Sequence, residues 1–87
     1  MALGPKLIEK LEKLYAPDSK LDQHYNGKDL TFITNENGEA VTLFIGRRLE
    51  DGTISGERYV RKIVRDNKTG KMVRSHWDLK GKVTRGN

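Results

Sequence analysis

Residues 29–49 read DLTFITNENGEAVTLFIGRRL, and this stretch decides the fold. Two segments in which apolar residues alternate with other residues flank the dipeptide Asn37-Gly38. An Asn-Gly pair between alternating segments is the strongest short signal for a β-hairpin, because both residues adopt the positive φ that the tight turn needs. We therefore predict antiparallel strands at residues 29–34 and 40–49.

The same pattern continues towards the C-terminus. Asp51-Gly52 is a second turn signal, followed by a predicted strand at residues 57–66. A turn at residues 67–70 leads into a predicted strand at 71–79, and residues 80–83 either add a short fifth strand or fray. Connections this short join antiparallel neighbours, since a parallel pair needs a crossover of about a dozen residues. The sheet is therefore predicted to be an antiparallel meander of four or five strands.

A short amphipathic helix is predicted at residues 5–15. Pro5 suits the first helical position, and Pro17 ends the helix because proline disfavours helical backbone at the residue before it. The apolar residues recur at the spacing of one helical face: Leu7, Ile8, Leu11, Leu14 and Tyr15. Residues 16–29 are interpreted as a polar connection with a turn at Asn26-Gly27. The predicted fold is α+β, in a single domain of residues 1–87 with mobile ends at 1–4 and 84–87. Three shapes of the sheet are compatible with this pattern: an open sheet, a half-barrel, or a more closed barrel with the helix plugging one end.

If Asp51-Gly52 is a two-residue turn like Asn37-Gly38, strand alternation sorts the side chains onto two faces. One face is the predicted core: Leu30, Phe32, Val41, Leu43, Ile45, Val60, Val64, Val73, Trp77 and Leu79, with Arg58 and Lys62 among them. The opposite face carries Thr31, Ile33, Thr42, Phe44, Arg48, Tyr59, Arg61, Ile63, Arg65, Met72, Arg74, His76 and Asp78. A slip of one residue at a turn would exchange the faces of every strand beyond it.

Charge is distributed unevenly along the chain. From Ile45 onward there are twelve Lys/Arg against five Asp/Glu, a balance of +7, whereas the first 44 residues carry −2; the formal net charge is +5. A one-sided positive field attracts polyanions. The chain has no cysteine, no apolar run long enough to span a bilayer and no signal-peptide pattern, so we expect a soluble cytoplasmic protein without a membrane partner.

The suspected binding surface is the face opposite the core. It combines aromatic rings with arginines, which are the ingredients for stacking bases and following phosphates of single-stranded nucleic acid. The candidate residues are Phe44, Arg48, Tyr59, Arg61, Arg65, Arg74 and His76. Exposure of Phe44 and Tyr59 in the monomer is the observation that separates this hypothesis from its rivals.

Two alternatives stay open. The same rings could form a protein-interaction or homodimer interface, since Tyr, Met and Arg are enriched at interfaces. A small-ligand or enzymatic domain would instead have a pocket near His76 and Asp78. No metal-ligand spacing, phosphate-binding glycine loop or nucleophile pattern is present, so we expect no cofactor, no metal and no enzymatic activity.

Four segments carry a family resemblance: residues 14–19 (LYAPDS), 25–28 (YNGK), 56–59 (GERY) and 76–82 (HWDLKGK). Together they resemble short bacterial proteins of an uncharacterised family. The resemblance covers most of the chain and implies no catalytic or binding residue.

Overall fold

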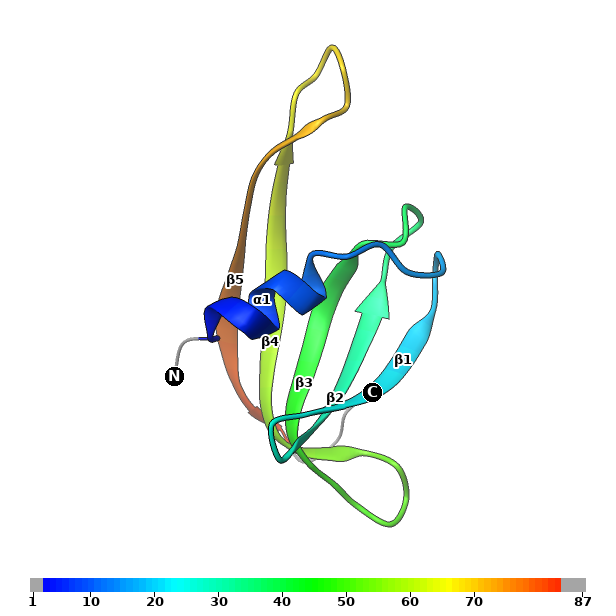
Figure 1. The fold of residues 1–87 in the computed structure, drawn as a ribbon, viewed down its shortest axis with the longest axis vertical. Helices are drawn as coiled ribbons and strands as arrows, with labels where there is room; N and C mark the ends of the chain where they lie inside the picture. The colour runs from blue at the N-terminus through cyan, green and yellow to red at the C-terminus, as the bar shows by residue number, and fades with distance from the viewer. Residues whose placement is uncertain (1–2, 84–87) are drawn as a thin grey trace.

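The computed structural model describes residues 3–83. These residues contain one helix and five strands: α1 (Pro5–Leu11), β1 (Lys20–Tyr25), β2 (Lys28–Thr34), β3 (Ala40–Arg48), β4 (Ile54–Arg65) and β5 (Met72–Val83). The strands form one antiparallel sheet whose spatial order follows the chain (Figure 1). The predicted α+β meander is confirmed, and within residues 3–83 the sheet is open, with β1 and β5 as its edges. The predicted mobile ends lie outside the described residues, except for Leu3 and for Gly4, which is the N-cap of α1.

The hydrophobic core lies between α1 and one face of the sheet (Figure 1). Helix residues Leu7 and Leu11 are buried in one cluster with Leu30, Phe32, Ala40, Leu43, Ile45 and Tyr59. Tyr15 adds an aromatic contact, with its ring centroid 4.9 Å from that of Phe32. A helix of seven residues is too short to be stable alone in water, so burial of its apolar face holds it in place.

The helix ends earlier than predicted, at Leu11 rather than at residue 15. Beyond it the chain pairs with the β2–β3 loop instead: Leu14 forms an isolated antiparallel bridge with Glu39, and the amide of Tyr15 donates to the carbonyl of Gly38 at 2.8 Å. As a result Leu14 is 71% exposed rather than buried. Tertiary hydrogen bonding therefore overrides the helical periodicity at the C-terminal end of this segment.

Residues 16–29 were predicted to be a polar connection, and this is wrong because they contain β1. Tyr25 pairs with Lys28 across a two-residue turn in which Asn26 and Gly27 both have positive φ, at 49° and 80°. This is the same kind of hairpin turn as the one expected at Asn37-Gly38. The signal was present in Asn26-Gly27 but was obscured by the low hydrophobicity of β1 (KLDQHY).

The predicted register between β2 and β3 is confirmed. Leu30 lies opposite Ile45 and Phe32 opposite Leu43. The predicted two-residue turn at Asn37-Gly38 is wrong, because the Asn35 amide donates to the Glu39 carbonyl at 2.9 Å and only Gly38 of the pair has positive φ, at 80°. The loop therefore has three residues, 36–38, and the register shift between Ile33 and Thr34 offsets the extra residue.

The predicted register between β3 and β4 is wrong by one residue. Leu43 lies opposite Tyr59 rather than Val60. The Leu49 amide donates to the Thr53 carbonyl at 2.8 Å, so the connection has three residues rather than two, with Gly52 at φ 89°. A three-residue connection ending in a left-handed residue is the next most common hairpin loop, and it moves every residue of the following strand to the other face.

A second register shift restores the predicted faces in β5. The four-residue turn at 67–70 forms as predicted, with Arg65 opposite Met72, but a shift between Val64 and Arg65 then places Val64 opposite Arg74. Because this shift and the one at the preceding turn cancel, Trp77 stays on the core face and His76 stays on the opposite face.

The molecule is elongated, with principal extents of 45 × 25 × 20 Å. The extension comes from the far end of the β4–β5 hairpin, which projects beyond the other strands (Figure 1). We call residues 62–74 the basic ribbon.

Candidate nucleic-acid interface

The structure does not bring the predicted site residues together on one surface. The shift at the β3–β4 turn places three of them on the face that α1 covers: Tyr59, Arg61 and Arg65. The other four lie on the opposite face: Phe44, Arg48, Arg74 and His76. The arginine-rich aromatic surface expected from the sequence is therefore divided between the two sides of the sheet.

Neither predicted stacking ring is exposed. Phe44 is 3% and Tyr59 is 2% accessible to solvent. Burial raises the pKa of the Tyr59 hydroxyl, and the charge of Glu57 raises it further. Both rings are therefore structural in the monomer, and neither presents a face on which a base could stack.

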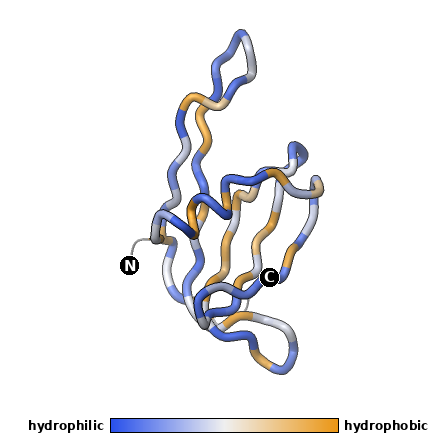
Figure 2. The backbone as a smooth tube through the Cα atoms, viewed as in Figure 1, coloured by the Kyte–Doolittle hydropathy of each residue, from blue (hydrophilic) through white to orange (hydrophobic). Residues whose placement is uncertain are grey.

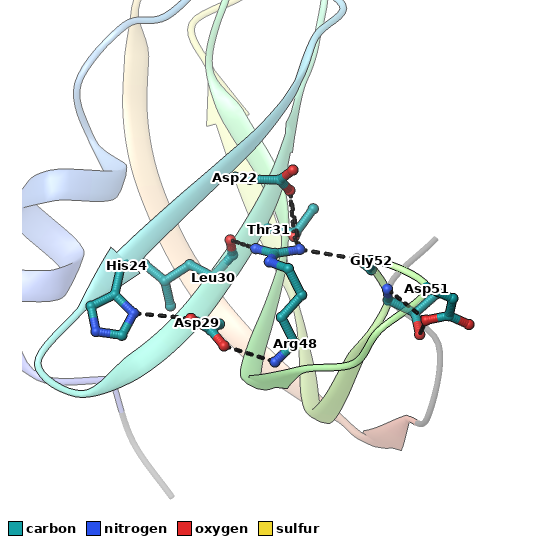
Figure 3. A network of polar contacts seen from close by, with 9 residues as sticks. Asp22, His24, Asp29, Leu30, Thr31, Arg48, Asp51 and Gly52 are labelled. Carbon is teal, nitrogen blue, oxygen red and sulfur yellow. Dashed lines mark hydrogen bonds and ion pairs between the residues drawn. The ribbon is translucent and has the colours of Figure 1, made fainter.

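Arg48 is committed to a network that joins three strands and a turn (Figure 3). Its guanidinium donates to the Leu30 carbonyl at 2.8 Å, and to the Thr31 hydroxyl and the Gly52 carbonyl at 3.0 Å each. The carboxylate of Asp22 lies 3.3 Å away. Through these contacts Arg48 connects β1, β2 and the β3–β4 turn, so its guanidinium is not free to bind a phosphate.

Asp29 extends the same network. It accepts a hydrogen bond from the Arg48 amide at 2.8 Å and contacts the His24 ring at 2.9 Å (Figure 3). The bond from the Arg48 amide, followed by that to His24, lowers the pKa of the Asp29 carboxyl below its ordinary 3.8.

This shift predicts a contribution of Asp29 to acid stability. A carboxyl whose pKa is lower in the folded than in the unfolded state stabilises the fold above about pH 4. That contribution is lost as the pH falls through the folded-state pKa. Asp29→Asn should therefore flatten the dependence of the unfolding free energy on pH below about pH 4, measured by urea titration at several pH values. Glu36→Gln, at an exposed side chain without a hydrogen bond or ion pair to residues 3–83, should keep the wild-type slope; equal slopes for Asp29→Asn and wild type would contradict the prediction.

Arg61 is buried beneath α1. Its Nε donates to the Ser75 hydroxyl at 2.6 Å, and its guanidinium carbon lies 5.9 Å from the centre of the Trp77 ring. Burial lowers the pKa of Arg61, while the carboxylates of Glu12 and Glu39 oppose that effect. Arg61 is 7% exposed, so it serves the core rather than a surface.

Arg65 is likewise engaged within the protein. It forms an ion pair with Glu39 and donates to the Gly70 carbonyl at 3.2 Å. Burial alone would raise the pKa of Glu39, but the hydrogen bond from Asn35 and the charge of Arg65 lower it.

The free positive charge lies on the basic ribbon. Four of its cations are exposed and form no ion pair with residues 3–83: Lys62, Lys68, Lys71 and Arg74. Asp66 is the one acid in residues 62–74. Its carboxylate accepts hydrogen bonds from the amides of Lys68, at 2.7 Å, and Thr69, at 3.0 Å, which lower its pKa.

Three of these cations were not among the predicted site residues, most of which were arginines or aromatic residues on one face of the sheet. Lys62 was assigned to the core face, Lys68 was interpreted only as a turn residue, and Lys71 only as the first residue of a predicted strand. The density of Lys and Arg around the turn at 67–70 was the available signal.

His76 and Asp78 do lie together, with 3.3 Å between their side chains. Both are about half exposed. The adjacent hydroxyl, Ser75, points to the other face of the strand and is bonded to Arg61, so it does not accompany the pair.

A groove lies between α1 and the β5 side of the sheet, with a volume of about 330 Å³. Its lining includes Ile8, Glu12, Tyr59, Ser75, Trp77 and Leu79. The indole nitrogen of Trp77 is buried without a hydrogen-bond partner among the described residues. Solvent does not reach this atom, but the lining also includes the polar side chains of Glu12, Ser75 and His76, so the groove has polar as well as apolar walls.

Residues 3–83 contain no group of three His, Cys, Asp or Glu side chains that could hold a metal ion. The single helix in this part of the chain is also too short and too polar to cross a membrane. Comparisons with protein-family models, with curated proteins and with solved structures found no match to this chain.

Proposed function

We propose that the protein is a small binding module that attaches to double-helical nucleic acid through its basic ribbon. The observation that carries this proposal is the projection of the β4–β5 hairpin beyond the sheet (Figure 1). This hairpin carries four exposed cations that form no ion pair with residues 3–83. Neutralising phosphates with Lys and Arg releases counterions, and this release supplies most of the affinity for nucleic acid that does not depend on sequence.

The shape of the ribbon favours a duplex over a single strand. A two-stranded β-ribbon fits the major groove of B-form DNA, which is about 12 Å wide. Recognition of single strands depends on aromatic stacking, but residues 62–74 contain no aromatic residue and Phe44 and Tyr59 are buried. The proposed partner is therefore a duplex bound by the basic ribbon, rather than a single strand stacked on the face of the sheet.

The cations of the ribbon lie close enough to act together. Val64 lies opposite Arg74, and Lys62 opposite His76, so Lys62 and Arg74 are diagonal neighbours on the face away from α1. Lys68 and Lys71 follow at the turn. Apolar Val64 and Met72, which are 43% and 36% exposed, add groups that can contact sugars or thymine methyls.

The test compares two triple variants that both lower the formal charge from +5 to +2. The ribbon variant is Lys62→Gln, Lys68→Gln, Lys71→Gln, and the control is Lys6→Gln, Lys13→Gln, Lys28→Gln, at exposed positions outside the ribbon. A labelled duplex of about 20 base pairs, two helical turns, is titrated by fluorescence anisotropy at two salt concentrations. If all three ribbon lysines contact phosphates, the slope of log K against log salt becomes shallower by about 2.7, at about 0.9 per contact.

The ribbon variant should also bind the duplex at least about tenfold more weakly than the control at low salt. A single strand of the same sequence is expected to bind more weakly than the duplex. The proposal fails if wild type does not bind the duplex at low salt, or if the two variants weaken binding equally.

A further inference from the structure

The exposed apolar side chains are concentrated at one edge of the sheet. Among residues 3–83 the large hydrophobic residues that are exposed are Leu14, Val64, Met72, Val73 and Leu79. Three of the five lie on β5, an edge strand, and Val64 lies on its neighbour β4. Figure 2 shows apolar stretches on both strands of this hairpin. The other edge strand, β1, carries none of the five.

The β5 edge also offers hydrogen-bonding groups. In an antiparallel ladder every second residue of an edge strand turns its N–H and C=O away from its neighbour. β5 contains two irregularities, near Val73 and near Lys80, that interrupt such an edge. Between them, residues 74–79 form a regular stretch of six residues that can accept another strand.

We propose that a second copy of this chain pairs antiparallel along β5, with the two-fold axis at His76. In this register Arg74 lies opposite Asp78 of the partner subunit, and symmetry repeats the pair on the other side of the axis. Val73, 63% exposed, lies opposite the partner subunit's Leu79, itself 43% exposed. The interface therefore pairs opposite charges twice and covers the most exposed apolar residues of the edge.

Neighbouring registers lose this complementarity. Residues that oppose each other across the two-fold axis must lie on the same face of the sheet, so the axis can move only by whole residues. An axis at Trp77 places Arg74 opposite Lys80 of the partner subunit, which pairs like charges. An axis at Ser75 places Arg74 opposite His76 of the partner subunit and removes both Arg–Asp pairs. Opposite charges across a strand pair stabilise it and like charges destabilise it, so the register centred on His76 is the favoured one.

The association is expected to be weak. The regular pairing centred on His76 covers only residues 74–78 and buries less than the roughly 1,200 Å² typical of stable interfaces, so the dimer is expected to be transient. The dimer does not depend on the proposed nucleic-acid binding, because it is measured on the protein alone.

Charge exchange tests both the dimer and its register. Sedimentation velocity of wild type from about 5 μM to about 1 mM should show a reversible dimer. Asp78→Arg and Arg74→Asp should each raise the dissociation constant at least about tenfold, since like charges then face each other across the axis. The double variant, Arg74→Asp with Asp78→Arg, restores opposite charges and should return the constant to within about threefold of wild type.

Two control variants change the charge equally at exposed positions away from β5. Glu50→Arg matches Asp78→Arg, Arg47→Asp matches Arg74→Asp, and both should leave the dimer unchanged. A monomer at every concentration overturns the proposal. A dimer that the exchange does not rescue overturns the register, and with it the assignment of β5 as the interface.

Discussion

Replacing Gly56 with alanine is expected to destabilise the protein by about 3 kcal/mol or more, because the added methyl group has no space. A Cβ at this position would lie 2.0 Å from the Ile45 carbonyl oxygen and 2.8 Å from the Cα of Gly46. Both neighbours are backbone atoms, so β3 and β4 would have to separate. Gly56 and Gly46 face each other across these strands, and their lack of side chains permits this close approach.

Urea unfolding followed by circular dichroism measures this effect. For a domain of this size, about 3 kcal/mol corresponds to a fall in Tm of roughly 12–24 °C. Gly4→Ala is the matched control, since a Cβ there would meet nothing within 4 Å, and at the N-cap of α1 it should cost no more than about 1 kcal/mol. A Gly56→Ala variant as stable as the Gly4→Ala variant would show that the two strands are further apart than described.

Replacing Arg48 with methionine is expected to cost about 3 kcal/mol of unfolding free energy. Methionine keeps most of the apolar stem but removes the guanidinium that bonds the Leu30 carbonyl, the Thr31 hydroxyl and the Gly52 carbonyl. Thr31 is only 1% exposed, so water replaces this partner poorly. The loss also releases the β3–β4 turn from the sheet.

Arg47→Met provides the control for this experiment. Arg47 precedes Arg48 on β3, is exposed, and its side chain forms no hydrogen bond or ion pair with residues 3–83. The same substitution there should change stability by less than about 0.5 kcal/mol. Similar losses for both variants would mean that the effect comes from net charge rather than from the Arg48 network.

The candidate site was harder to predict than the fold, and the strand β4 shows why. Its sequence places apolar residues at both alternating sets of positions: Tyr59 and Ile63 on one, Val60 and Val64 on the other. Either set could face α1, so the hydrophobic pattern does not select a register. The length of the loop at residues 50–52 sets the register of β4, and this register places Tyr59 and Arg61 on the core face.

The arginines show a second reason why the candidate site was hard to predict from the sequence. Arg48, Arg61 and Arg65 are similar in sequence terms to Arg74, but each of the three finds acceptors in parts of the chain that are distant in sequence. Whether a cation is free to bind a ligand depends on such contacts, and these contacts cannot be predicted from amino-acid composition.

Local chemistry in the sequence determined the antiparallel pairing of β2, β3, β4 and β5, because connections this short can only join antiparallel neighbours. The register of β2 with β3 agrees with the prediction because an extra loop residue and a register shift cancel. The sequence also determined that the C-terminal half is positive. Tertiary structure alone decided where α1 ends, which face Tyr59 and Arg61 occupy, and which cations stay free. These outcomes depend on which burial and hydrogen bonds the whole chain can satisfy at once, and a single extra loop residue or bulge is enough to exchange the two faces of a strand.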